Sequence, residues 1–96
     1  MKQAATYIMT NKPKGTLYVG MTGHFPARIQ QHREGSGSAF CKRYGLGKLV
    51  WYELFELVTD AIRQEKQIKA GSRKDKIALI ESVNPRWNDL YLTLNA

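Results

Sequence analysis

The stretch YVGMTGHFPARIQQH, residues 18–32, predicts a strand that passes directly into a helix. Its first four residues favour a strand, and Thr22-Gly23 interrupts it. Pro26 suits the first turn of a helix, where no amide partner is needed. Arg28 and His32 then stand four residues apart, so they lie on one face of that helix. A hydrophobic core does not need this arrangement, whereas a bound phosphate would suit it.

Working outward from this stretch, the sequence predicts a small α+β domain. The expected elements in chain order are strands over 5–10 and 16–21, a helix over 25–34, a strand over 48–56, and helices over 60–70 and 73–83. This order describes a small, three-stranded, mostly antiparallel sheet flanked by helices, in a single domain spanning residues 1–96. We expect the strand over 48–56, which is the strongest strand pattern, at the centre of the sheet.

The first two strands should form a hairpin, because turn residues fill positions 11–15. If the chain turns about Lys12-Pro13, Tyr7 lies opposite Tyr18, and both rings share one face of the sheet. The segment 35–47 holds four glycines with Lys42 and Arg43, which predicts a basic loop with a functional role.

The ends of the last two helices carry recognisable signals. Thr59 is a candidate N-cap for the helix over 60–70, and Gly71 is its candidate C-cap. Ser72 with Asp75 three residues later predicts a capping box at the start of the next helix.

Composition restricts the class of protein. Fifteen Lys and Arg residues oppose eight Asp and Glu residues, and the net charge of +7 favours a polyanionic partner, most simply nucleic acid, over ordinary solubilising charge. No apolar run of about 18 residues exists, so we expect no membrane span. The N-terminus lacks the apolar region of a signal peptide, and Cys41 has no partner for an internal disulfide. A cytoplasmic location follows as the expectation.

Glu65 is the most informative acidic residue. In the helix over 60–70 it lies three residues from Ile62 and from Ile68, on the apolar side. An ionised carboxylate on that side costs several kcal/mol unless a cation pairs with it. Either the carboxylate lies at the edge of the apolar side, or a cation, such as an internal arginine or a metal ion, pairs with it. The other acids show no metal-ligand spacing, which fits one Mg²⁺ held by one glutamate, waters and a substrate phosphate.

The chain carries Tyr7, then Tyr18-Val19-Gly20, followed by Arg28, His32 and Glu65. The order and spacing of these residues resemble the GIY-YIG endonuclease superfamily, with the small stand-alone bacterial uncharacterised members looking closest. The first motif reads Ala5-Thr6-Tyr7, which keeps only the family's tyrosine.

The resemblance implies a metal-dependent DNA endonuclease that hydrolyses phosphodiester bonds. The catalytic residues it implies are Tyr7, Tyr18, Arg28, His32, Glu65 and Asn84. Glu65 would hold Mg²⁺ or Mn²⁺, and one of the two tyrosines would help to activate water. Asn84 is preferred over Asn88 as the family's late asparagine because it directly follows the last helix.

Contacts with nucleic acid are expected from a glycine at a strand end and from basic side chains. These residues are Gly20, Lys42, Arg43, Lys66, Lys69, Arg73, Lys74 and Lys76, with a solvated helix face as the alternative for the last five. No recognition helix or zinc finger is evident, so cutting should be structure-selective or weakly sequence-specific, of the kind used in DNA repair and recombination. RNA stays open as a substrate, and the protein could be a monomer or a weak homodimer.

Two alternatives to an active nuclease stay open. The chain could be a nucleic-acid-binding module with weak or lost catalysis, or a basic interaction domain without a nucleic-acid role.

Overall fold

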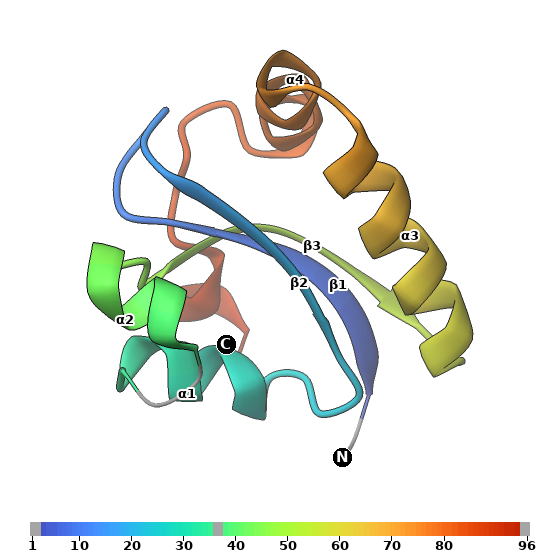
Figure 1. Cartoon of the computed structure of the whole chain (residues 1–96). Helices are drawn as coiled ribbons and strands as arrows, with labels where there is room; N and C mark the ends of the chain where they lie inside the picture. The colour runs from blue at the N-terminus through green and yellow to red at the C-terminus, as the bar shows by residue number, and fades with distance from the viewer. Residues whose placement is uncertain (1–2, 36–37, 95–96) are drawn as a thin grey trace.

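The computed structural model describes residues 3–35 and 38–94, in which one antiparallel sheet has helices on both faces (Figure 1). The strands are β1 (Ala4–Thr10), β2 (Leu17–Thr22) and β3 (Lys48–Phe55); the helices are α1 (Ala27–Arg33), α2 (Ala39–Tyr44), α3 (Val58–Ala70), α4 (Arg73–Val83) and a short 3-10 helix, η1 (Leu90–Thr93). The α+β architecture and the order of the six predicted elements are confirmed, with α2 and η1 added. Across the described ranges, no helix has both the length and the apolar composition to cross a bilayer.

The strand order is β2-β1-β3, so β1 is central and the expectation for the strand over 48–56 was wrong. All seven residues of β1 are buried, and none of them is charged. A strand that is paired on both edges and covered on both faces has no place for a charged side chain. β3 carries Lys48 and Glu53, both exposed, as an edge strand can.

The register of the hairpin also differs from the expectation. Tyr7 pairs with Gly20, and Tyr18 pairs with Met9. The turn is centred one residue later than expected, with Lys14 in the left-handed conformation at φ 57°. Moving the centre of a turn by one residue changes the pairing by two, so each side chain keeps its face. The two tyrosines therefore still share one face, although they are diagonal neighbours.

Two apolar clusters fill the spaces on either side of the sheet. In Figure 1, β2 crosses in front of β1, with α1 and α2 on one side and α3 and α4 on the other. The cluster beneath α1 and α2 contains Ala5, Tyr7, Met9, Phe25, Ile29, Cys41, Leu46 and Leu49. The cluster beneath α3 and α4 contains Ile8, Val19, Val50, Trp51, Ile68, Ile80 and Trp87. The alternation of side chains along β1 thus commits Tyr7 to the α1 side.

The predicted helix ends are confirmed in part. The Ser72 hydroxyl accepts from the Asp75 backbone N–H at 3.0 Å, and the Asp75 carboxylate accepts from the Ser72 N–H at 3.1 Å, which completes the capping box. Gly71 ends α3 as expected. Thr59 does not cap α3, because Leu57 occupies the N-cap position, without a side-chain hydrogen bond.

The segment 35–47 is not wholly a loop, because α2 lies within it. Ser38 caps the N-terminus of α2, and its hydroxyl accepts from the Cys41 N–H at 3.5 Å. Gly45 ends the helix in the left-handed conformation at φ 65°. Buried Cys41 and Leu46 hold the segment against the sheet. Lys42 and Arg43 therefore stand on a helix beside β2 rather than on an extended loop.

Candidate active site

The two tyrosines lie at the β2 edge of the sheet, on the face that α1 and α2 cover. Their ring centroids are 6.4 Å apart, with Tyr7 only 2% exposed and Tyr18 half-buried. A Cβ atom added at Gly20 would lie 2.8 Å from the Tyr7 hydroxyl and 2.9 Å from Cε2 of Tyr18. The glycine therefore gives both rings the room they occupy. Its expected contact with nucleic acid stays a prediction.

Helix α1 brings His32 to both rings. Phe25 and Ile29 anchor this region in the core, while Pro26 takes the N-cap position rather than the first turn. The His32 ring centroid lies 5.5 Å from that of Tyr7 and 5.6 Å from that of Tyr18. The Tyr7 hydroxyl and His32 Nε2 form a hydrogen bond of 2.8 Å. We call Tyr7, Tyr18 and His32 the tyrosine–histidine cluster.

His32 is a buried side chain with one ring nitrogen that is unpaired among the described residues. It is 4% exposed, and its Nδ1 atom has no hydrogen-bond partner in the part of the chain that the structure describes. Buried polar atoms are normally paired, so an unpaired one calls for an explanation, of which a catalytic role is one. His32 thus has one ring nitrogen committed to Tyr7 and the other uncommitted.

Charges from both sides of the sheet act on this cluster. Burial raises the pKa of Tyr7 well above its usual 10.0, with a further increase from Tyr18; the Arg28 guanidinium lowers this pKa, and the Glu65 carboxylate raises it. Burial, followed by the charge of Arg28, lowers the pKa of His32 from its usual 6.5. Because the pKa of Tyr7 is raised and that of His32 is lowered, Tyr7 is a phenol and His32 is a neutral imidazole at neutral pH.

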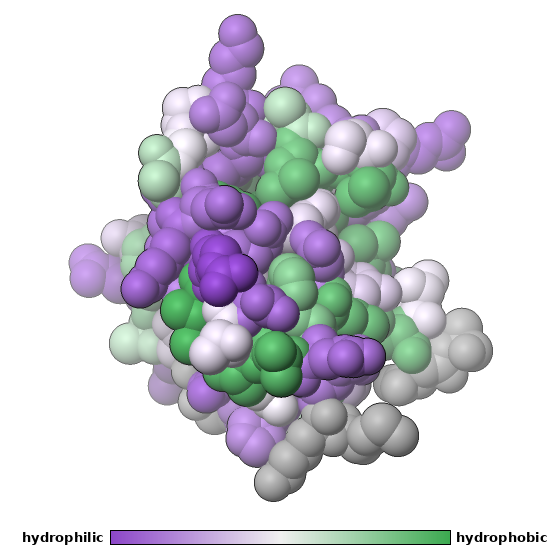
Figure 2. Space-filling model, turned by 90° about the vertical axis from the view of Figure 1, so that its right-hand side faces the viewer, coloured by the Kyte–Doolittle hydropathy of each residue, from purple (hydrophilic) through white to green (hydrophobic). Residues whose placement is uncertain are grey.

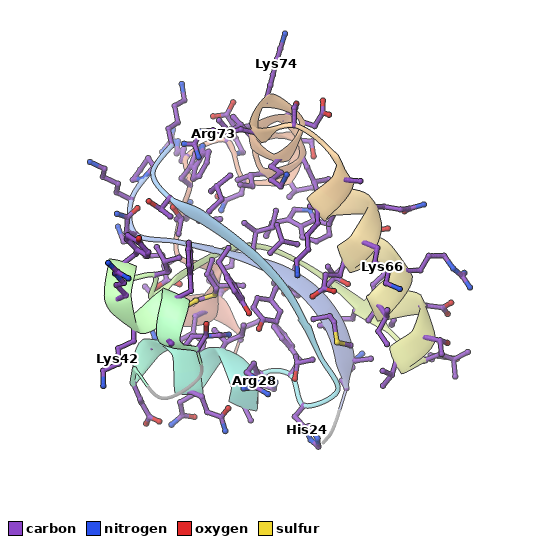
Figure 3. The ribbon with its side chains drawn as sticks, in the orientation of Figure 1. His24, Arg28, Lys42, Lys66, Arg73 and Lys74 are labelled. Carbon is purple, nitrogen blue, oxygen red and sulfur yellow. The ribbon has the colours of Figure 1, made fainter. Side chains whose placement is uncertain are left out.

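Arg28 and Glu65 approach from opposite faces of the sheet. Arg28 lies at the start of α1, across β2 from α3, where the neighbour of Glu65, Lys66, is found (Figure 3). Helix α3 is fastened to β1 by the Thr6 hydroxyl, which donates to the Ala61 carbonyl oxygen at 2.7 Å. Glu65 follows one turn later. The structure thus brings five of the expected residues to the β2 edge.

The Glu65 carboxylate could bind a metal ion that needs only one or two protein ligands. Its side chain is 19% exposed, and the Lys69 ammonium lies 3.4 Å from one of its oxygens. Within residues 3–35 and 38–94, no three His, Cys, Asp or Glu side chains gather as a metal site. A carboxylate oxygen suits Mg²⁺, which commonly keeps several waters and needs only one or two protein carboxylates. The donor set therefore fits such an ion when a substrate phosphate completes its shell.

Asn84 is placed away from this cluster. Its amide nitrogen donates to the Val50 and Asn88 carbonyl oxygens at 3.0 and 2.9 Å, and its Oδ1 accepts from the Asn88 N–H at 3.0 Å. These contacts tie the end of α4 to β3. A direct catalytic role stays a prediction, and the two asparagines that compete for the family position are bonded to each other.

The expected basic residues are spread over three helices rather than forming one patch around the cluster. Lys42 and Arg43 lie on α2, Lys66 and Lys69 on α3, and Arg73, Lys74 and Lys76 on α4. Lys42 and Lys74 point away from opposite ends of the molecule (Figure 3). The side formed by α3 and α4 is largely hydrophilic, with apolar groups between (Figure 2).

Some of these basic side chains also hold the fold. Arg73 donates to the carbonyl oxygens of Lys14 and Gly15 at 2.6 and 2.7 Å, which ties α4 to the hairpin turn. Lys76 donates to the Gly71 carbonyl oxygen at 2.7 Å.

Phe40 is a neighbour of the cluster that the sequence reasoning missed. It lies on α2, stacked against Tyr18 with ring centroids 6.0 Å apart and ring planes at 30°. The Ser38 and Gly45 caps were the signal that could have revealed a helix here and, with it, a surface for aromatic residues.

Comparison with known proteins identifies the family of this chain. Residues 3–78 match the GIY-YIG catalytic domain, so the chain belongs to the GIY-YIG family. Its relatives include bacterial proteins named UPF0213. The one from Staphylococcus haemolyticus is 36% identical over 81 residues, 84% of this chain and 98% of its own length. The one from Clostridium perfringens is 37% identical over 76 residues, 79% of this chain and 81% of its own length. No solved structure matches the chain.

Proposed function

We propose that this chain is a metal-dependent endonuclease that hydrolyses phosphodiester bonds in DNA, acting as one nuclease domain over residues 1–96. The supporting observation is the convergence of the tyrosine–histidine cluster with Arg28 and Glu65 at the β2 edge, in a chain of the GIY-YIG family. These side chains supply complementary chemistry at one place. The two phenol rings and the imidazole can transfer a proton, the guanidinium can bind a phosphate, and the carboxylate can bind a cation.

Proton transfer is assigned to Tyr7 and His32. A free tyrosinate is unfavourable here, because burial raises the pKa of Tyr7. The hydrogen bond of 2.8 Å offers a relay instead: Tyr7 accepts the proton of the attacking water while its own proton passes to His32 Nε2. A bound phosphate assists the second transfer, because it neutralises the Arg28 charge that lowers the pKa of His32. Tyr18, which is more exposed, orients the water and the phosphate.

Arg28 binds the scissile phosphate. Its guanidinium stands close enough to the cluster to shift the pKa of both Tyr7 and His32. A planar fork of N–H donors suits the phosphate oxygens, which gain negative charge in the transition state. Loss of one such donor typically costs about 100- to 1,000-fold in kcat.

Glu65 would hold the divalent ion, Mg²⁺ or Mn²⁺. When bound, such an ion neutralises charge on the leaving 3′ oxygen. The Lys69 ammonium, 3.4 Å from one Glu65 oxygen, helps to orient the carboxylate.

Substrate choice follows from what surrounds the site. Basic side chains on α2, α3 and α4 contact phosphates and position the nucleic acid without reading sequence. We therefore propose structure-selective or weakly specific cutting of DNA, as in repair or recombination, with RNA as a comparison substrate. The same proposal includes a cytoplasmic location, which is expected from the single cysteine. It also includes a monomeric or weakly dimeric state.

The test is a cleavage assay on plasmid, branched and single-stranded DNA with Mg²⁺, Mn²⁺ or EDTA. We expect metal-dependent cutting that falls about 100-fold or more in Arg28→Gln. Tyr7→Phe should lose activity while keeping DNA affinity. Cutting that persists in both variants at the wild-type rate would remove the assigned roles.

A second candidate is a nucleic-acid-binding module with weak catalysis. The departure of the first motif, Ala5-Thr6-Tyr7, and the raised pKa of Tyr7 favour it. The same assay separates the two, since a binding module retains salt-dependent DNA binding and yields no metal-dependent products.

A further inference from the structure

Helix α2 exposes two aromatic rings directly beside the tyrosine–histidine cluster. Phe40 is 43% exposed and Tyr44 is 46% exposed, with ring centroids 4.8 Å apart. Phe40 also stacks on Tyr18, whose ring lies 6.4 Å from that of Tyr7. A continuous row of rings thus leads from the buried hydroxyl of the site to the surface. Neither Phe40 nor Tyr44 belongs to the apolar clusters of the core.

A hollow of about 320 Å³ lies along this row. Its walls are formed by Leu17, Tyr18, Val19, Phe40, Lys69 and Lys76. One wall is therefore aromatic and apolar, whereas the two lysines supply ammonium groups. Lys69 also contacts Glu65, the proposed metal ligand, at 3.4 Å. The hollow consequently adjoins the carboxylate that is proposed to hold the metal ion.

Further positive charge lies beside the row of rings and beside the hollow. The Arg43 guanidinium lies over the Tyr44 ring, 5.6 Å from its centroid. Leu17 and Lys76 of the hollow also line a second groove of about 640 Å³, to which Lys12 and Arg73 contribute. A flat π surface flanked by cations complements a ligand that has a flat aromatic group on an anionic chain.

A nucleotide strand has this chemistry, and the base must be unpaired. Bases within a duplex are already stacked and hydrogen-bonded to their partners, so their faces are closed to a protein ring. Unpaired bases stack readily on exposed aromatic side chains, with little dependence on their identity. An apolar peptide or a second copy of this chain would gain nothing from the lysines, given that the chain itself carries a net charge of +7.

We propose that Phe40 and Tyr44 form a stacking platform for an unpaired nucleobase of the strand that enters the site. The substrate is therefore DNA with at least one unpaired nucleotide beside the scissile bond: a single strand, a flap or a branch point. The position relative to the scissile bond rests on the proposed nuclease function, whereas the stacking itself does not.

The experiment measures binding in EDTA, so that cleavage plays no part. The probe is a single-stranded oligonucleotide carrying 2-aminopurine, whose fluorescence decreases on stacking, and a fully paired duplex serves for comparison. We compare Phe40→Ala, Phe40→Leu and Phe40→Tyr with Leu54→Ala, a control on the opposite edge strand with a matched exposure of 42%.

The expected result separates stacking from simple apolar contact. Phe40→Ala and Phe40→Leu should weaken binding of the single strand by roughly fivefold to a hundredfold and abolish the fluorescence decrease. Phe40→Tyr should retain both. Duplex affinity should change by less than about twofold in every variant, and Leu54→Ala should behave as wild type, because neither involves a base on the platform.

Equal losses for single strand and duplex, or full binding in Phe40→Leu, would overturn the platform. A change of oligomeric state in Phe40→Ala, with single-strand binding intact, would assign the rings to a protein interface and also overturn it. Cleavage is then measured separately with Mg²⁺. A protein that stacks the base without cutting refutes the nuclease proposal alone, while one that cuts without using Phe40 refutes the platform alone.

Discussion

Replacing Gly20 with alanine tests whether the rings of the site are held in one position. The added Cβ atom would lie 2.8 Å from the Cζ and hydroxyl oxygen of Tyr7, and 2.9 Å from Cε2 of Tyr18. Tyr7 cannot swing aside easily, because it is 2% exposed and hydrogen-bonded to His32. The substitution therefore displaces the tyrosines or bends β2.

The magnitude follows from two opposing effects. Overfilling a packed interior typically costs about 1–3 kcal/mol. Alanine in a strand regains about 0.5–1 kcal/mol relative to glycine, because it loses less backbone entropy on folding. Taking the middle of each range, we expect a net decrease of about 1 kcal/mol in the free energy of unfolding. For a domain of this size, that corresponds to a fall in Tm of about 4–8 °C.

The assay is thermal and urea unfolding followed by circular dichroism, with DNA cleavage measured below the transition. Gly47→Ala is the matched control, since a Cβ atom added there would meet no other group within 4 Å and its φ is not positive. It should leave both stability and cleavage unchanged, or add slightly to stability. Gly20→Ala should lose cleavage even where it is fully folded. A Gly20→Ala protein as stable and as active as wild type would falsify the reasoning.

Three further predictions follow from contacts and pKa values. Burial holds the pKa of His32 below 6.5, so the folded state binds fewer protons than the unfolded state in mildly acidic solution. The free energy of unfolding should therefore decrease as pH falls below about 7, and His32→Asn should flatten that decrease. The same pH dependence in His32→Asn as in wild type would contradict this prediction. Asn84→Ala leaves buried hydrogen-bonding groups without partners and should lower the free energy of unfolding by about 1–3 kcal/mol in urea titrations. DNA affinity, measured below the unfolding transition, should stay at the wild-type value. A variant that is as stable as wild type but has lost cleavage would instead give Asn84 a role in the reaction. If about five phosphates are contacted, a plot of log affinity for duplex DNA against log salt should have a slope near −4.5. Lys66→Gln should make that slope less steep by about 0.9. An unaltered slope would exclude Lys66 from the DNA interface.

Local signals in the sequence predicted most of the fold. The hairpin, the helices over 60–70 and 73–83, the Gly71 stop and the Ser72–Asp75 capping box each depend on residues a few positions apart. The place of β1 at the centre did not follow from such signals. Pairing of β1 with β3 joins residues about 45 positions apart, and an uncharged strand of seven residues was the only trace of it.

The site was predictable to the extent that a family pattern fixes residue types. The pattern pointed to Tyr7, Tyr18 and His32, which the fold brings together, but the hydrogen bond between Tyr7 and His32 depends on how α1 packs on the sheet. The raised pKa of Tyr7 could not be foreseen either, because it arises mainly from burial in the folded chain. Phe40 was missed because a glycine-rich segment was interpreted as a loop.

Metal dependence of strand cleavage in Glu65→Gln tests the central claim most directly. Glutamine keeps the size of the side chain and removes the charge, and Glu53→Gln on the exposed edge of β3 is the control. We predict that Glu65→Gln binds DNA with wild-type affinity in EDTA but loses cleavage by at least about 100-fold at every Mg²⁺ concentration, while Glu53→Gln cuts normally. Wild-type cleavage by Glu65→Gln, with the same Mg²⁺ dependence, would contradict the account.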